Sequence, residues 1–131
     1  MNAFLVDLEN KPGAIATVAE ALGTKGINIT NVAGASCGDS GRAAFTTADE
    51  AGTRAALQSI KATFKELEIT QVNLANTPGS LGKATRRLAN AGVNIEAILP
   101  TGMSGSEVSV GFVTNNPAKT REVLATATTA R

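Results

Sequence analysis

A stretch of 22 residues that occurs twice, without a gap, limits the fold of this chain more than any other feature. The first copy covers residues 8–29 and the second covers residues 74–95, an offset of 66. Because chance seldom places Asn-x-Pro-Gly and Gly-[Ile/Val]-Asn-Ile at one fixed offset, we interpret the stretch as an internal duplication. The identical pairs are Leu8/Leu74, Asn10/Asn76, Pro12/Pro78, Gly13/Gly79, Leu22/Leu88, Gly26/Gly92, Asn28/Asn94 and Ile29/Ile95.

Each copy has the pattern of a strand, a turn and an amphipathic helix. The proline fits the first helical turn, where its missing N–H would have no partner in any case. Gly26 and Gly92 are placed to end the helices as C-terminal caps, and Asn28 and Asn94 then begin the next strand. The residues that recur with helical spacing are Ile15, Val18, Ala19 and Leu22, and in the second copy Leu81, Ala84, Thr85 and Leu88.

The remaining segments complete a β-α-β-β-α order in both copies. Residues 67–75 are too few for two strands, so we expect one strand that serves both copies, with a bulge or bend where the apolar phase shifts between Ile69 and Val72. Pro100 is expected to end its strand, and the chain leaves no room for a last strand in the second copy. We expect strands at 3–8, 27–36, 42–47, 67–75, 93–99 and 108–112, helices at 13–25, 49–64, 79–91 and 117–128, and turns at 38–41 and 101–106, the second one residue longer.

The composition is that of a globular protein, with 43% hydrophobic residues, 18% charged residues and a net charge of +1. There is no dense basic segment, and the chain has four Phe but no Trp or Tyr, which disfavours a nucleic-acid binder. No apolar run approaches the roughly 18 residues of a membrane span. Because the N-terminus is too short and too acidic for a signal peptide, we expect a cytoplasmic protein.

The sequence contains no His and a single Cys, Cys37, which is expected to be a small buried residue. An internal disulfide is therefore impossible, and a zinc site is disfavoured, so we expect no metal and no cofactor. An enzyme that uses Asp, Glu, Lys or Ser stays possible, but no spacing points to one. The basic side chains of Lys83, Arg86 and Arg87 are expected to form a solvated helix face.

The Pro-Gly turn offers chemistry for an amino acid. The N–H groups of Gly13 and Ala14 have no partner within the helix, and the helix dipole adds positive potential, so a carboxylate is a natural guest. Asn10 offers a carbonyl oxygen to an ammonium group, and the carbonyls near Asn28 would add acceptors if they lie close by. The alternative is that Asn-x-Pro-Gly is simply good turn and cap chemistry, and that Asn28 and Asn94 cap strands.

These motifs resemble those of the ACT domain family. The resemblance rests on Asn10, Pro12, Gly13, Leu22, Gly26, Ile27, Asn28 and Ile29 and their partners 66 residues later. Residues 41–46 also resemble the third strand of the aspartate-kinase type. The resemblance implies an α+β, ferredoxin-like fold of two tandem units, residues 1–66 and 67–131, which share one antiparallel sheet through strand 67–75 and have helices on one face.

The resemblance further implies a regulatory protein without catalytic activity, which binds a free amino acid. Because Asn10 and Asn76 stand where the family often has an acid, we expect a neutral ligand. The expected ligand residues are Asn10, Lys11, Pro12, Gly13, Ala14, Ile15, Asn28 and Ile29, with Asn76, Thr77, Pro78, Gly79, Ser80, Leu81, Asn94 and Ile95 in the second copy.

The expected partners are a second copy of the chain and a regulated enzyme. Homodimerisation is expected because the sheet face that carries Leu5 would be left open and the outer strands have unpaired edges. The alternative function is a structural protein–protein interaction module whose pockets are degenerate. A small ferredoxin-like enzyme is disfavoured by the absence of His and Tyr.

Overall fold

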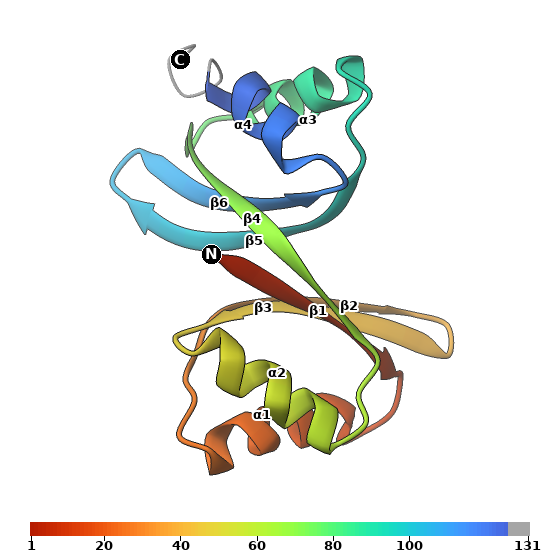
Figure 1. Ribbon diagram of the computed structural model, residues 1–131. Coiled ribbons are helices and arrows are strands. Elements are labelled where there is room, and N and C mark those ends of the chain that lie inside the picture. The colour runs from red at the N-terminus through yellow and green to blue at the C-terminus, as the bar shows by residue number, and fades with distance from the viewer. Residues whose placement is uncertain (126–131) are drawn as a thin grey trace. The chain divides into compact units, whose positions relative to one another are not determined.

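The computed structural model describes residues 1–125, which divide into two compact units at the Leu67–Glu68 peptide bond. The β-α-β-β-α order predicted for each copy is found in both units, with the helices and strands labelled in Figure 1. The elements are β1 (Asn2–Glu9), α1 (Ala14–Thr24), β2 (Ile29–Cys37), β3 (Ser40–Thr47), α2 (Glu50–Ser59), β4 (Phe64–Ala75), α3 (Ser80–Asn90), β5 (Ile95–Ser104), β6 (Glu107–Thr114) and α4 (Pro117–Ala125).

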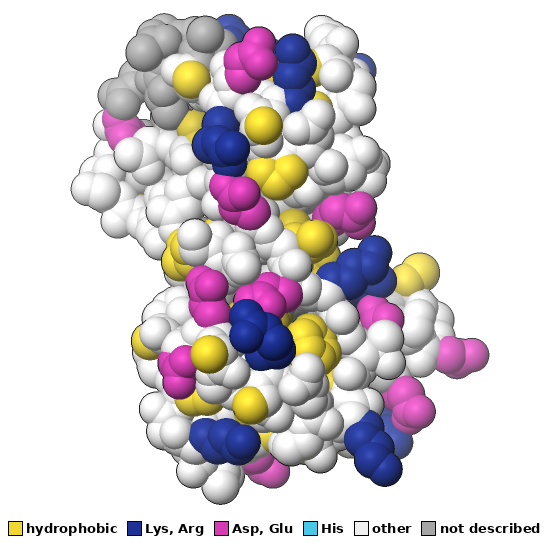
Figure 2. Space-filling model, in the orientation of Figure 1, with side chains coloured by type: hydrophobic (Ala, Val, Ile, Leu, Met, Phe, Trp, Pro, Cys, Tyr) yellow, Lys and Arg dark blue, Asp and Glu magenta, His cyan; other side chains and the backbone are white. Residues whose placement is uncertain are grey.

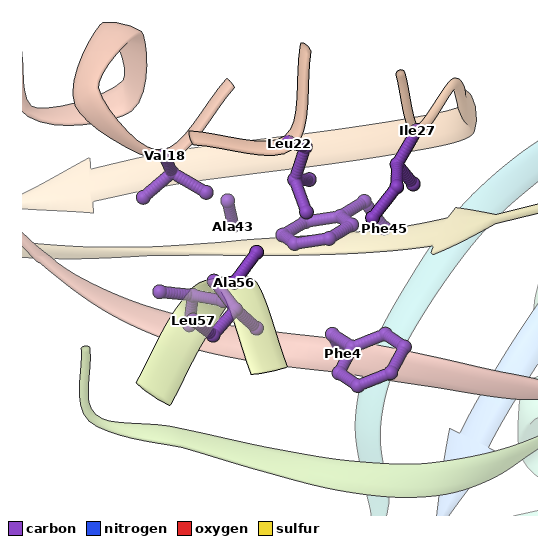
Figure 3. Packing of buried hydrophobic residues seen from close by; sticks show 9 residues of the cluster. Phe4, Val18, Leu22, Ile27, Ala43, Phe45, Ala56 and Leu57 are labelled. Atoms are coloured by element: carbon purple, nitrogen blue, oxygen red, sulfur yellow. The ribbon is translucent and has the colours of Figure 1, made fainter. Parts of the chain in front are cut away.

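In unit 1, β3 lies between β1 and β2 and is antiparallel to both. Helices α1 and α2 lie on one side of these strands, and apolar side chains fill the space between the two layers (Figures 1 and 3). Phe4 and Phe45 are opposite each other in the β1–β3 register, and their ring centroids are 6.0 Å apart. The buried core is Phe4, Val6, Val18, Leu22, Ile27, Ala43, Phe45, Ala56 and Leu57.

Unit 2 repeats this arrangement. Strand β6 lies between β4 and β5, antiparallel to both, and α3 and α4 lie on one side of the strands (Figure 1). A buried hydrogen bond between two threonine hydroxyls is also repeated. It joins Thr47 and Thr53 at 2.8 Å in unit 1, and Thr114 and Thr120 at 2.7 Å in unit 2. The buried core is Val72, Leu74, Ala84, Leu88, Val93, Val110, Phe112 and Leu124.

Glycine ends α1 and α3 as predicted. Gly26 and Gly92 follow these helices with φ of 71° and 74°, a conformation that glycine adopts without a Cβ penalty. The Ile27 N–H donates to the Leu22 carbonyl at 3.0 Å, and the same bond recurs 66 residues later at 2.9 Å. This is the Schellman arrangement, which turns the chain sharply from the helix into the next strand.

The second helix of each unit is capped at its N-terminus by a side chain. The carboxylate of Asp49 accepts a backbone N–H of α2 at 2.9 Å, and the amide oxygen of Asn116 accepts one of α4 at 3.1 Å. Pro117 is the first residue of α4, where its missing N–H needs no partner, so the predicted start of this helix at residue 117 is confirmed. The predicted end of this helix, with Ala127 and Thr128, lies outside the described residues.

The predicted helix over residues 49–64 is too long. Helix α2 ends at Ser59, and Lys61 then takes a φ of 57°, which cannot continue a right-handed helix. Phe64 is the first residue of β4, and its ring lies 6.2 Å from that of Phe4 between centroids. Ile60 and Phe64 have helical spacing in the sequence but do not lie on one helix. Strand β4 begins three residues before the predicted strand.

Strand β5 contains its proline instead of ending there. Pro100 lies inside β5, and the register with β6 shifts directly after it, so Thr101 is the extra residue of a bulge. A proline is tolerated at such a position because the ladder is already interrupted. The following turn, Gly105-Ser106, is two residues long, like the turn after β2. The additional residue of the second copy thus lies in the strand and not in the turn.

The phase shift within β4 is not a bulge. The register between β4 and β6 runs without interruption from Ile69–Val113 to Ala75–Glu107. Ile69 and Val72 are both buried, but only Val72 belongs to the core under the helices. Because residues an odd number apart point to opposite faces, the shift marks the point where the buried side chains change faces. The sharing of β4 by one continuous sheet stays a prediction.

Two predictions of exposure are wrong. Leu5, expected on an open face of the sheet, is only 1% exposed. Cys37, expected to be buried, is exposed at the end of β2. Alternation along β1 does place Leu5 on the face opposite to Phe4 and Val6, but that face is covered at Leu5 and not open to solvent.

Candidate ligand site at the Pro-Gly turns

The two Pro-Gly motifs form the same tight turn. The Ala14 N–H donates to the Lys11 carbonyl and the Ser80 N–H to the Thr77 carbonyl, both at 3.3 Å. The glycines have φ, ψ of 89°, −9° and 90°, −10°, in unit 1 and unit 2 respectively. Proline followed by a glycine with positive φ is the signature of a type II turn. Both prolines therefore precede their helices, and the prediction that Pro12 and Pro78 lie in the first helical turn is wrong.

The hydrogen bond that closes each turn uses one of the N–H groups of the predicted carboxylate site. The N–H groups of Ala14 and Ser80 are hydrogen-bonded inside the turns and are not free for a ligand. Within residues 1–125, the N–H groups of Gly13 and Ile15 have no acceptor, and neither do those of Gly79 and Leu81. Of the two donors predicted in unit 1, the Gly13 N–H thus stays available to a ligand and the Ala14 N–H does not.

Asn10 and Asn76 hold the turns against the hairpins that follow in the chain. The Asn10 N–H donates to Asp39 O at 3.0 Å, and its side-chain amide donates to Gly38 O at 2.9 Å. The Asn76 N–H donates to Ser106 O at 2.7 Å. The side-chain oxygen of each Asn accepts no hydrogen bond from residues 1–125, so an ammonium group could use it.

Lys11, a predicted ligand residue, is paired with a carboxylate. Its Nζ lies 2.8 Å from Glu9 Oε2, and both side chains are exposed. The hydrogen bond and charge of Lys11 lower the pKa of Glu9, and the same contact raises the pKa of Lys11. The equivalent residues of unit 2, Ala75 and Thr77, carry no charge.

Asn28 and Ile29 lie at the opposite end of α1 from the turn. Helix α1 has 11 residues, which corresponds to about 16 Å of length. The Asn28 carbonyl accepts the Ala48 N–H at 3.3 Å, and in unit 2 Asn94 and Asn115 are paired in the same place. One amino acid cannot contact the turn and Asn28 of the same unit, so these residues and Asn94–Ile95 are not brought together with the turns.

In unit 2 a cavity of about 670 Å³ lies beside the Pro78-Gly79 turn. This volume is in the range of small-molecule sites. The lining includes Thr77, Pro78, Gly79 and Ser80 of the predicted set, but not Asn76, Leu81, Asn94 or Ile95. The other lining residues are 73–75 at the end of β4 and Gly82, Lys83, Ala84, Arg86 and Arg87 on α3.

Sequence reasoning missed the α3 side of this cavity. Lys83 and Arg86 are exposed, as expected for a solvated face, and together with half-buried Arg87 they also line the cavity. Their spacing of i, i+3 and i+4 puts them on one helix face, which is the signal that could have indicated a site. Neighbouring Leu81 and its counterpart Ile15 are each 47% exposed, so the first turn of each helix also presents an apolar side chain.

A second hollow, of about 540 Å³, lies in unit 1 next to the β2–β3 hairpin. Its lining includes Cys37 and the ion pair of Asp7 with Arg42, which are 2.9 Å apart. None of the predicted ligand residues belongs to it.

Acidic and basic side chains lie close to one another over both units on the face seen in Figure 2. Within residues 1–125, no three His, Cys, Asp or Glu side chains are grouped in a way that could hold a metal ion. None of the described helices has the length and apolar character needed to cross a lipid bilayer.

Residues 3–65 match the ACT domain family model. The fold is similar to the crystal structure of protein BT0572 from Bacteroides thetaiotaomicron, at 26% identity and a TM-score of 0.76, over 95% of this chain and 86% of that one. It is also similar to aspartate kinase regulatory subunits from Thermus flavus (23%, TM-score 0.70, 98% and 89% covered) and Thermus thermophilus in its ligand-free form (22%, 0.67, 98% and 90%). No curated protein matches the sequence.

Proposed function

We propose that the chain is a non-catalytic regulatory module, built from two tandem ACT units, that binds a small amino acid at its Pro-Gly turns. Binding would modulate a partner enzyme or the assembly of the chain itself. The match over residues 3–65 supports the first unit, and the 66-residue repeat with its identical turns supports the second. We place the module in the cytoplasm, a location that stays a prediction from the sequence.

The observation that carries this proposal is the cavity at the Pro78-Gly79 turn. Four predicted ligand residues line it, and it borders the start of α3, where Leu81 and Gly79 have N–H groups without an acceptor in residues 1–125. A carboxylate fits such donors because the helix dipole adds positive potential. Asn76 does not line the cavity, but it lies directly before the turn, and its side-chain oxygen would receive an ammonium group that reaches beyond the cavity.

The structural-module alternative is favoured by one observation. The Ala14 and Ser80 N–H groups and the Asn10 amide are already satisfied by the turns and the hairpin. The Pro-Gly turns are thus stable without a ligand, as the turn-chemistry interpretation expects.

Titration calorimetry of the full chain with neutral amino acids tests the proposal. We expect binding in the micromolar to millimolar range, on the order of −4 to −8 kcal/mol. Gly82→Leu should abolish ligand binding in unit 2, because Gly82 lines the cavity and a leucine there would fill it. Gly82 is helical and a Cβ would meet no atom within 4 Å, so the substitution itself is not strained. Valine at Gly13 or Gly79 is a poorer probe, because their positive φ strains any side chain whatever the space.

The matched control is Gly23→Leu on α1. Gly23 is also a helical glycine with open space, but it does not line the cavity. Binding that is lost in Gly82→Leu and retained in Gly23→Leu supports the site. A wild type that binds none of the twenty amino acids would leave the structural-module alternative in place.

Self-association through exposed apolar side chains is also part of the proposal. Leu5 is buried, but exposed apolar side chains recur at equivalent positions of the two units. They are Ile15 and Leu81 on the helices and Val32 and Ile98 on β2 and β5. We expect a homodimer by light scattering at tens of micromolar, and Val32→Lys should shift it toward the monomer. A wild-type monomer with and without amino acids contradicts this part.

A further inference from the structure

The cavity of unit 2 is basic. Lys83, Arg86 and Arg87 line it, and no Asp or Glu does. Lys83 and Arg86 form no ion pair with any other residue of the described chain, 1–125. Like charges three and four residues apart on a helix repel one another, so the cavity concentrates positive potential that a bound anion would neutralise.

The polar groups that complete the cavity are mainly donors. The Gly82 N–H has no acceptor among residues 1–125, and Asn73 contributes a side-chain amide. The hydroxyls of Thr77 and Ser80 lie 3.0 Å apart, so one donates to the other and the second retains a proton to donate. Donors and cations without a carboxylate are the chemistry that binds an anion.

Unit 1 carries the opposite charge at the equivalent positions. Its copy of the same surface has acids where unit 2 has neutral or basic residues, and it has none of the three bases. The pairs, unit 1 first, are Asp7/Asn73, Glu9/Ala75, Lys11/Thr77, Thr17/Lys83, Glu20/Arg86 and Ala21/Arg87. The basic cavity is therefore not required by the fold, because unit 1 keeps the same turn and helix without it.

We propose that the cavity of unit 2 binds a small dianion, either a dicarboxylate or a phosphate ester. Two negative charges suit the two neighbouring cations Lys83 and Arg86 better than one does, and the donors at the start of α3 add to the attraction. The proposal goes beyond the proposed function by assigning a different class of ligand to unit 2, and it rests on that function only for the position of the ligand. It requires no ligand of this kind in unit 1.

Calorimetry of the full chain at low ionic strength, with succinate, inorganic phosphate, acetate and alanine as probes, tests this inference. We expect at least one dianion to bind about tenfold or more tightly than acetate. Phosphate without succinate would identify a phosphate ester as the ligand class, and succinate without phosphate a dicarboxylate. Lys83→Gln and Arg86→Gln should each weaken the bound dianion about fivefold, the effect of one partly exposed ion pair.

Lys65→Gln is the matched control, because Lys65 is exposed on β4 and does not line the cavity. It removes the same charge and should change dianion affinity less than twofold. Equal weakening by Lys65→Gln and Lys83→Gln, or no dianion binding at about 10 mM, overturns the inference. Alanine binding without dianion binding would defeat the inference and keep the proposed function. Dianion binding without binding of any neutral amino acid would support the inference and contradict the proposed function.

Discussion

The two Pro-Gly turns have the same backbone conformation, but the charged side chains around them differ. Their glycines differ in φ by one degree, and the helix after each turn buries a leucine completely, Leu22 or Leu88. Yet the turn of unit 1 is flanked by the Glu9–Lys11 ion pair, and the turn of unit 2 by a basic cavity. The residues that make the turn and the core are fixed by geometry, whereas the side chains around the turn are free to change.

The largest expected effect tests whether the two cores are equivalent. Leu22→Ala and Leu88→Ala each remove a side chain with 0% exposure, and each should cost about 2–5 kcal/mol of unfolding free energy. Because the chain has no Trp or Tyr, urea unfolding is followed by circular dichroism. If β4 is shared as predicted, both variants lower the same single transition. Two separate transitions, each sensitive to one variant, would contradict the shared strand.

The second prediction tests whether the two turns are equally strained. Gly13→Ala and Gly79→Ala should each destabilise the chain by about 1–2 kcal/mol, because a Cβ meets no atom within 4 Å and only the positive φ opposes it. The control substitutions Gly23→Ala and Gly82→Ala lie in helices and should stabilise by about 0.5–1 kcal/mol. A large difference between Gly13→Ala and Gly79→Ala would show that the turns are not equivalent.

The repeated frame could be predicted because its signals are local. Pro-Gly sets a turn and Gly26 or Gly92 ends a helix whatever surrounds them. The proline of β5 could not be placed, because a bulge at Thr101 depends on the register with β6. The same is true of Phe64, whose helical spacing is overruled by the left-handed Lys61.

The candidate site could be predicted only in part. The turn residues of unit 2 were found from their motif, because the motif itself forms the turn. The contribution of Lys83, Arg86 and Arg87 depends on how α3 packs beside the end of β4, which no local pattern encodes. Asn28 was expected near the turn, and the length of α1 prevents this within one unit.

The third prediction concerns the two asparagines before the turns. Asn76→Asp should shift ligand preference toward a cationic amino acid by about 1 kcal/mol, or roughly fivefold, because it adds a charge in a partly exposed site. Asn10→Asp should also destabilise unit 1, because its amide then no longer donates to Gly38 O. Competition between lysine and alanine, measured by calorimetry, gives the preference. An unchanged ratio in Asn76→Asp would place the ammonium site elsewhere.

The smallest expected effect concerns the ion pairs that hold the second helix of each unit to β4. In unit 1, Arg54 donates two hydrogen bonds of 2.8 Å to Glu66, and in unit 2 Arg121 pairs with Glu68. The hydrogen bonds from Arg54 lower the pKa of Glu66 below its ordinary value of 4.5, against a smaller opposing effect of burial. Because the folded-state pKa is lowered, the stabilisation is present above pH 4.5 and is lost as the pH falls through the lowered pKa.

Glu66→Gln should therefore cost up to about 1 kcal/mol at neutral pH and less at about pH 2.5, because protonation of the wild-type carboxyl removes the charge that the variant lacks. The measurement is urea unfolding of the variant and the wild type at both pH values. The control is Glu20→Gln, an exposed carboxylate without an ion pair in the described chain, which should change stability little at either pH. If Glu66→Gln lowers the free energy of unfolding equally at both pH values, Glu66 acts through packing and not through its charge. The Arg54–Glu66 pair would then not be an electrostatic counterpart of the Arg121–Glu68 pair.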